Sequence, residues 1–256
     1  MGTLAIIISL ALLMFFAYRG ISVLILAPIM AAVAILLSGD MAYMMPQYTE
    51  TFMSALGGYI LKFFPIFLLG ALFGQLMVDS GAASSISNSI MNKLGYQRAI
   101  LTVVLACGVL TYGGVSLFVV AFAIYPIAKS MFQAANIPKR LIPGAIALGS
   151  FTFTMTALPG SPSIQNAIPI PFFGTNVFAA PGIGIISGLI MFSLGSIWLQ
   201  SRANKARSNG EGYGVDTEEG EKLEDGVTSK GEMPVFLAFL PLLLVIGVNA
   251  LFTYII

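Results

Sequence analysis

Residues 149–171 read GSFTFTMTALPGSPSIQNAIPIP, a stretch that begins like a membrane helix and then breaks. A helix needs about 20 consecutive apolar residues to cross a bilayer. Here the apolar run that begins at Ile142 meets PGSP at residues 159–162, which cannot continue a helical hydrogen-bond ladder. Backbone groups freed in a membrane need partners in protein or beside water, so the break predicts a binding cavity. A short loop between two packed helices is the alternative interpretation.

Uncharged polar side chains surround the break. Their hydroxyl and amide groups can bind a hydrated or anionic solute through hydrogen bonds while carrying no charge. These residues are Thr152, Thr154, Thr156, Ser161, Ser163, Gln165 and Asn166. We therefore treat them as candidate contacts for a solute.

The composition indicates an integral membrane protein. Hydrophobic residues make up 57% of the chain and charged residues 9%, whereas a soluble domain has about 25% charged residues. The net charge of +1 and the absence of histidine give no sign of nucleic-acid binding. Cys107 is the only cysteine, which excludes an internal disulfide and a cysteine-based metal site. No catalytic dyad, phosphate loop or metal-ligand cluster is present, so we expect no enzyme, cofactor or metal.

Seven apolar segments predict an all-α polytopic membrane protein. They are residues 4–18, 21–37, 59–78, 100–128, 141–158, 182–199 and 234–256. Arg19 follows the first segment, whereas the loop at 38–58 contains Asp40 and Glu50 and no basic residue. The positive-inside rule therefore places Arg19 in the cytoplasm and this loop outside, and the later basic clusters fit the same topology. We expect a multi-pass protein of the cell inner membrane, surrounded by membrane lipid.

The segment at 99–130 is predicted to enter and leave the membrane on the cytoplasmic side. Its arms at 100–110 and 117–128 are shorter than a full span, and they flank the small polar sequence TYGGVS at 111–116. This pattern predicts a re-entrant helical hairpin whose tip exposes backbone amides and partial positive charge, which suits an anionic group. An ordinary tight pair of helices, with glycines for close packing, is the alternative.

We interpret residues 1–200 as one membrane repeat unit. Its predicted parts are scaffold helices at 4–78, the hairpin at 99–130, a broken transmembrane helix at 141–170 and a helix at 182–200. Eight of the eleven acidic residues lie in 201–232 among glycines and serines, which predicts a flexible cytoplasmic linker. Residues 233–256 are predicted to be a final transmembrane helix that starts a missing second half. For Asp79 a helix-end or capping role is preferred over a role in a cavity.

Three motifs resemble the gluconate permease family. They are GALFGQLMVDSGAA at 70–83, YGGVS at 112–116 with Phe118 and Pro126 after it, and ALPGSPSIQN at 157–166. They occur in the order that the family has. The resemblance implies two inverted repeats, each with a re-entrant hairpin and a broken helix, and an elevator-type transport domain. It also implies proton-coupled uptake of gluconate or a related sugar acid or hydroxycarboxylate.

Matched residue by residue, the resemblance implies a substrate site with two parts. The hairpin tip would contribute Gly113, Gly114 and Ser116, and the broken helix would contribute Gly160, Ser161, Ser163 and Asn166. Members of the family are longer, and this chain corresponds to about their first half. Either the sequence is truncated, or a second polypeptide or a second copy of the chain completes the transporter.

The leading hypothesis is a secondary active transporter whose carboxylate substrate is held by hydroxyls, amides and helix N-termini. Between Arg98 and Arg202 the only charges are Lys129, Lys139 and Arg140, at the predicted cytoplasmic edge, so a buried arginine clamp is not expected. A sodium-coupled carboxylate carrier is the second hypothesis, because carbonyls freed near the break and the hairpin tip suit sodium. A non-transporting membrane fragment or subunit is the third.

Overall fold

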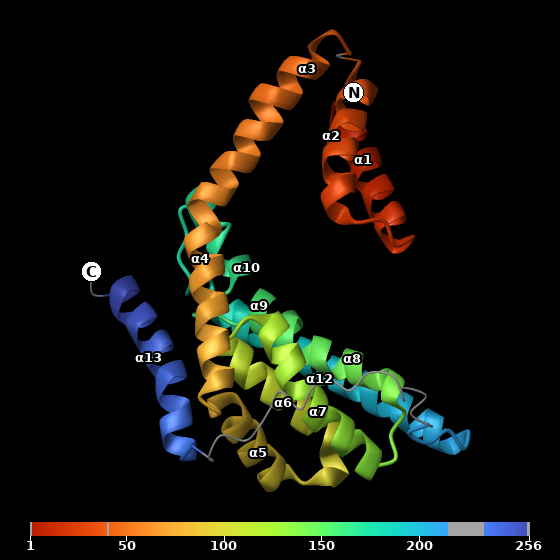
Figure 1. Cartoon of the computed structure of the whole chain (residues 1–256), viewed down its shortest axis with the longest axis vertical. Coiled ribbons are helices and arrows are strands. Elements are labelled where there is room, and N and C mark those ends of the chain that lie inside the picture. Colours follow the sequence, from red (N-terminus) through yellow and green to blue (C-terminus); the bar gives the residue numbers. More distant parts are fainter. Residues whose placement is uncertain (1, 40, 215–232, 255–256) are drawn as a thin grey trace. The chain divides into compact units, whose positions relative to one another are not determined.

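The computed structural model describes residues 2–39, 41–214 and 233–254, and its regular structure over these ranges is helical without strands (Figure 1). Four helical runs are long and apolar enough to cross a membrane, and a bent pair of helices raises this number to five. The four runs are Met44–Asp79, α7 (Leu117–Ala134), α12 (Pro181–Ser208) and α13 (Val235–Tyr254). The predicted all-α, multi-pass class is confirmed. The repeat and the re-entrant path stay predictions.

The chain divides into two compact units, Met1–Pro65 and Ile66–Ile256. In the first unit, α1 (Gly2–Tyr18) and α2 (Val23–Ser38) pack against each other after a tight turn. The Ser9 hydroxyl donates a buried hydrogen bond of 2.6 Å to the Met30 carbonyl, which joins the two helices. The two helices have 17 and 16 residues, which is shorter than a usual span.

Residues 41–58, predicted as part of a loop, are helical, so the prediction of a loop was wrong; the location of this segment outside stays a prediction. Four consecutive helical elements follow residue 40: η1 (Met41–Tyr43), α3 (Met44–Pro46), the π-helical η2 (Gln47–Phe52) and α4 (Met53–Asp79). The polar residues at 47–50 resembled a loop, yet no Pro-Gly turn interrupts the backbone there, and Pro46 lies near the helix start where proline is tolerated. At the other end, Asp79 is the last residue of α4 and accepts a 3.0 Å hydrogen bond from the Gln75 side chain.

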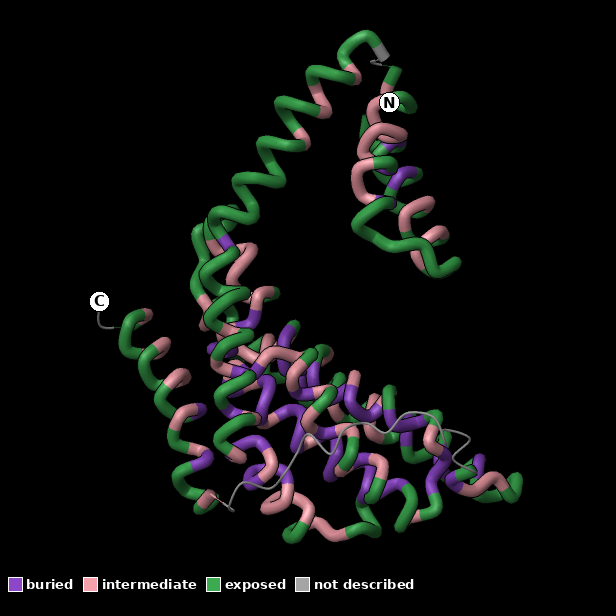
Figure 2. Tube along the Cα trace, viewed as in Figure 1, coloured by how far each residue is buried: buried purple, intermediate pink, exposed green. Residues whose placement is uncertain are grey.

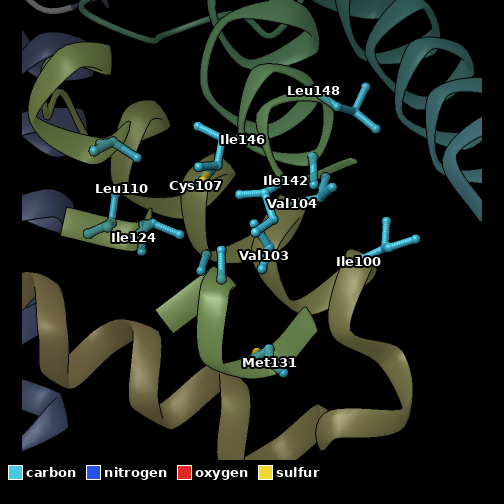
Figure 3. Close-up of a cluster of buried hydrophobic side chains, with 14 of the residues drawn as sticks. Ile100, Val103, Val104, Cys107, Leu110, Ile124, Met131, Ile142, Ile146 and Leu148 are labelled. Atoms are coloured by element: carbon cyan, nitrogen blue, oxygen red, sulfur yellow. The ribbon is translucent and has the colours of Figure 1, made fainter. Parts of the chain in front are cut away.

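The second unit is built around α6, and its core is drawn in Figure 3. Its helices, in addition to those already given, are α5 (Ala82–Leu94), α6 (Ala99–Tyr112), α8 (Ile142–Ala147), the π-helical η5 (Leu148–Thr152), α9 (Phe153–Thr156), α10 (Ile164–Ala167) and α11 (Ile170–Phe173). Ten of the fourteen residues of α6 are buried, including small polar ones, because neighbouring helices cover it on several sides. Figure 2 shows this burial, in contrast with the mostly exposed and intermediate residues of α13.

The predicted hairpin corresponds to α6, a four-residue turn and α7. The turn at 113–116 lies where the sequence placed the tip, and Gly114 has a φ of +101°, which a residue with a side chain rarely adopts. The second arm is longer than expected: α7 has 18 residues and is long enough by itself to cross a membrane. At the other end of α6, a bend of 102° separates it from α5.

The start of the predicted linker is ordered. Helix α12 continues to Ser208, beyond the predicted boundary at 200, because SRANKARS consists largely of helix formers and ends with basic residues that favour a helix C-terminus. After it, the Arg140 guanidinium binds both carboxylate oxygens of Glu211 at 2.7 Å. The Tyr213 amide donates a 3.0 Å hydrogen bond to the Asn136 side chain. The rest of the predicted linker, 215–232, lies outside the described residues.

The contact between α6 and η5 depends on a glycine. A Cβ atom added to Gly149 would lie 2.4 Å from the Val104 carbonyl oxygen and 2.6 Å from Cys107 Cβ, and the backbone oxygen cannot move aside cheaply. We expect Gly149→Ala to lower the free energy of unfolding by about 1–3 kcal/mol through overpacking. Thermal unfolding in detergent measures this. Gly70→Ala, at a helical glycine with nothing within 4 Å, is the control and should not destabilise. An equal Tm for Gly149→Ala and the parent chain would contradict the close packing.

The ion pair of Arg140 and Glu211 predicts a pH-dependent contribution to stability. The hydrogen bond from Arg140 lowers the pKa of Glu211 below its ordinary 4.5. The contribution is therefore present above pH 4.5 and lost as pH falls through the folded-state pKa. We expect Glu211→Gln to lower Tm slightly at neutral pH, and the difference from the parent to shrink as the pH falls through the folded-state pKa of Glu211. Glu50→Gln serves as the control for loss of an exposed carboxylate. A difference that does not change with pH would argue against the pair.

Candidate functional site

The helix break lies at 157–163, between α9 and α10, and Gly160 is required at its centre. Gly160 has a φ of +81°, and its amide donates a 2.7 Å hydrogen bond to the Val177 carbonyl. A Cβ atom at this position would lie 2.4 Å from Cε1 of Phe178. The backbone conformation and the lack of space thus both disfavour a side chain at this position. The hydrogen bond to Val177 joins the break to the segment before α12.

Side chains of the break satisfy the carbonyls that the missing helical turns leave free. The Ser163 hydroxyl donates to the Met155 carbonyl at 3.1 Å. The Asn166 side-chain amide donates to the carbonyls of Leu158 and Ser161 at 3.3 and 3.2 Å. Two of the predicted site residues therefore direct their donor groups at their own backbone. This arrangement is what a break in an apolar environment requires.

The three threonines before the break do not present their hydroxyl hydrogens to a solute. The Thr154 hydroxyl donates to the carbonyls of Gly149 and Ser150, at 2.8 and 3.0 Å. Thr152 donates to the Leu148 carbonyl, and Thr156 to the Thr152 carbonyl at 2.6 Å. Their hydroxyl oxygens can still accept a hydrogen bond, so a role as solute contacts stays a prediction, above all for Thr156, which lines the pocket described below. The π-helical η5 changes the regular pattern of backbone hydrogen bonds, so that some carbonyls accept hydrogen bonds from threonine hydroxyls. The sequence does not indicate this use of the hydroxyls.

The residues of the hairpin tip face different neighbours. Gly113 lies against α13, because an added Cβ would be 2.4 Å from Cδ2 of Leu242. Gly114 lies against the break, since an added Cβ would be 3.0 Å from Cγ of Pro162. Ser116 is the N-cap of α7, and its carbonyl accepts the Val120 amide at 3.0 Å while its side chain makes no capping hydrogen bond. The amides at the start of α7 therefore lack a side-chain cap.

The hairpin and the break meet at Tyr112. Its hydroxyl donates a 2.9 Å hydrogen bond to the Pro159 carbonyl, 47 residues further along the chain. Close to this contact, Ser161 is 0% exposed, and its hydroxyl has no hydrogen-bond partner among the described residues. Ser163 is also buried. Of the seven predicted site residues, the structure thus brings Gly114 against the break that contains Gly160, Ser161 and Ser163, with Asn166 in the helix after it, whereas Gly113 lies against α13.

A pocket of 360 Å³ opens beside the break, between the break, the segment before α12 and the start of α12. None of its lining residues is charged. The polar side chains that line it are Thr156, Gln165, Asn166, Thr175, Asn176 and Ser187. Asn166 is the one residue in the lining that the family resemblance assigned to the substrate, and Thr156 and Gln165 had been named as polar neighbours of the break.

Sequence reasoning missed three polar residues of this pocket, Thr175, Asn176 and Ser187. Thr175 and Asn176 follow the α11 segment, and the Asn176 side chain accepts the Phe178 amide at 2.9 Å. Ser187 lies in the first half of α12. Polar residues within apolar segments are the sequence signal for such positions, but their spacing to Asn166 shows no local pattern.

The fold defines a class of protein: a multi-pass helical membrane protein whose chain is not helical at 157–163, beside a pocket lined by uncharged residues. Residues 1–255 match the family described as GntP family permease, and the chain belongs to that family. The resemblance drawn from the three motifs is thereby confirmed. The family is one of transporters and not of enzymes.

Two relatives support this assignment. The chain is 50% identical over 258 residues to "Uncharacterized transporter YxjC" of Bacillus subtilis (strain 168), covering 99% of this chain and 54% of that protein. It is 35% identical over 127 residues to an "Uncharacterized transporter" of Haemophilus influenzae, covering 49% of this chain and 30% of that protein. The chain thus spans about half the length of the Bacillus relative, and its match covers 30% of the Haemophilus relative. No solved structure matches.

The tight fit around Gly160 can be tested by comparison with Gly174. Gly174 also has a positive φ, but an added Cβ there would have no atom within 4 Å. We expect Gly160→Ala to lower Tm in detergent more than Gly174→Ala does. Both glycines have positive φ, but only Gly160 would place the new methyl group against Phe178. The steric part should cost about 1–3 kcal/mol. Equal losses for the two variants would mean that strain alone requires Gly160.

Proposed function

We propose that this chain provides the first half of a secondary active transporter, a permease of the cell inner membrane. Its substrate is gluconate or a related sugar acid or hydroxycarboxylate, carried with a proton by an elevator mechanism. The observation that supports the proposal most is the contact between hairpin tip and helix break, made by Tyr112 and Pro159, beside an uncharged polar pocket. The exposed apolar faces of the long helices would contact membrane lipid or the second repeat.

The chemistry of the pocket suits a small polyhydroxylated solute. Its 360 Å³ lies at the lower end of the range of about 300–1,000 Å³ for small-molecule sites. Amide and hydroxyl side chains both donate and accept hydrogen bonds, as sugar hydroxyls do. Asn166 lines the pocket and belongs to the family motif, so we assign it to the substrate most directly. The assignment of Gly113, Gly114, Ser116, Gly160, Ser161 and Ser163 is part of the same proposal.

The carboxylate of the substrate would be bound by backbone amides instead of a cation. Helix α7 has 18 residues, and its first amides lack a side-chain cap from Ser116. Partial positive charge at such a helix start attracts an anion. The coupling proton would be carried by the substrate itself or by a group in the second half of the transporter. Binding of the carboxylate by amides and the location of the coupling proton outside this pocket are suggested by the family resemblance and by the uncharged pocket lining.

Sodium coupling is the rival proposal, and the hydrogen bonds of the break weaken it. Four carbonyls at or next to the break already accept one side-chain hydrogen bond each, which leaves each of them one free lone pair for sodium; they are those of Met155, Leu158, Pro159 and Ser161. A proton needs no such ligand shell. We therefore favour proton symport, and the transport experiment below distinguishes the two ions.

Transport should be measured in proteoliposomes with radiolabelled gluconate, under an imposed pH gradient or an imposed sodium gradient. Two preparations are compared: this chain alone, and this chain co-expressed with the remaining part of the Bacillus relative. We expect uptake driven by the pH gradient in at least one preparation. Uptake driven only by sodium would support the rival. No uptake of gluconate, other sugar acids or citrate by inserted protein in both preparations would leave a non-transporting subunit as the function.

In the active preparation, Asn166→Ala should reduce gluconate uptake by about tenfold or more, because a buried polar contact to the substrate is lost. Asn204→Ala is the matched control, since Asn204 is an exposed amide on α12 paired with Gln200. Size-exclusion profiles of both variants report on folding. Normal uptake by well-folded Asn166→Ala would remove this residue from the site.

A further inference from the structure

We propose that Tyr112 is a positioning residue: its hydroxyl latches the hairpin onto the helix break and keeps the buried hydroxyl of Ser161 sealed from water. Tyr112 is the last residue of α6, is half-buried, and donates to the Pro159 carbonyl at 2.9 Å. The inference deepens the proposed function and rests on it, because opening of the latch would give a solute access to the break.

The latch bonds a carbonyl that the helix itself cannot satisfy. In a continuous helix the Pro159 carbonyl would accept an amide four residues later, but the chain is not helical between Ala157 and Ser163. A free carbonyl in an apolar environment is costly, so the Tyr112 hydroxyl supplies the missing donor. The hydrogen bond therefore has a physical reason to form and a cost when it opens.

Two contacts from the hairpin fall on residues that flank Ser161 in the chain. Tyr112 bonds the carbonyl of Pro159, two residues before it, and Gly114 lies close to Pro162, one residue after it, since a Cβ added to Gly114 would be 3.0 Å from Cγ of Pro162. Between these contacts Ser161 is 0% exposed, with a hydroxyl that has no partner among the described residues. A buried hydroxyl without a partner is unfavourable, so this closed arrangement favours any change that offers Ser161 water or a solute.

The remaining side-chain bonds of the break are local. Ser163 and Asn166 bond carbonyls within eight residues of themselves. They can keep the shape of the break while the hairpin tip moves away. The Tyr112 bond, by contrast, joins residues 47 apart on different elements. It can therefore open without unfolding the break, as a latch must.

The test measures access to position 161 by thiol labelling. Cys107, the only natural cysteine, is buried, so Ser161→Cys can be made in a Cys107→Ala background, and also with Cys107 retained in case that change impairs folding. Each is combined with Tyr112 or Tyr112→Phe, which keeps the ring and removes the hydroxyl. The rate of modification by N-ethylmaleimide is measured in proteoliposomes without solute. We expect about a fivefold faster rate with Tyr112→Phe, from the loss of one hydrogen bond.

Ser150→Cys is the matched control. Ser150 is also 0% exposed, but it lies in η5 and not next to either latch contact. Tyr112→Phe should leave its labelling rate unchanged. Equal rates at position 161 with and without the hydroxyl would overturn the latch. A parallel rise at positions 150 and 161 would also overturn it, since Tyr112 would then stabilise the core in general.

Adding gluconate separates the latch from the proposed function. Protection of the Ser161→Cys thiol by gluconate would support a sugar-acid site at the break. Labelling without solute tests the latch alone, because it requires no knowledge of the substrate. A latch that responds to Tyr112→Phe without protection by gluconate would keep the latch and contradict the substrate.

Discussion

The structure depends on one constraint: backbone groups released by a helix break must find partners where neither water nor lipid can provide them. The break at 157–163 meets it with short side chains that follow it in sequence and with one long side chain from another helix. Ser163 and Asn166 supply local donors, and Tyr112 supplies a distant one. The same hydrogen bonds that stabilise the break also determine which of its groups remain available to a solute.

Close packing by glycine brings the elements of this region together. Gly149, on η5, lets this element approach the backbone of α6. Gly108, on α6, leaves room for the side chain of Phe153. Because α6 is buried along most of its length, its C-terminal end and the turn after it are held firmly near the break. The hairpin tip is thus positioned by the core of the second unit, shown in Figure 3, and not by the turn alone.

The proposed function and the uncharged pocket agree on one kind of substrate recognition. A site without cations favours hydrogen bonding to hydroxyls and amide binding of a single carboxylate over the charge pairing that several carboxylates would require. Charged groups gather elsewhere, as in the pair of Arg140 and Glu211 that fixes the segment after α12. The described part of the chain therefore separates a neutral interior from a charged surface contact.

The sequence by itself determined the helical membrane class, the family, the position of the hairpin turn and the position of the break. These features are local, because they follow from apolar runs, from Gly-Gly at 113–114 and from PGSP at 159–162. Only the tertiary structure decided the hydrogen bonds from threonine hydroxyls to carbonyls of η5 and the helical conformation of residues 44–52. It also decided that Asn176 and Ser187 share a pocket with Asn166, and that the Tyr112 hydroxyl bonds the Pro159 carbonyl. These features join residues far apart in the chain or depend on a π-helical turn. No local pattern encodes them, since they arise only when packing brings a donor to a carbonyl left free elsewhere.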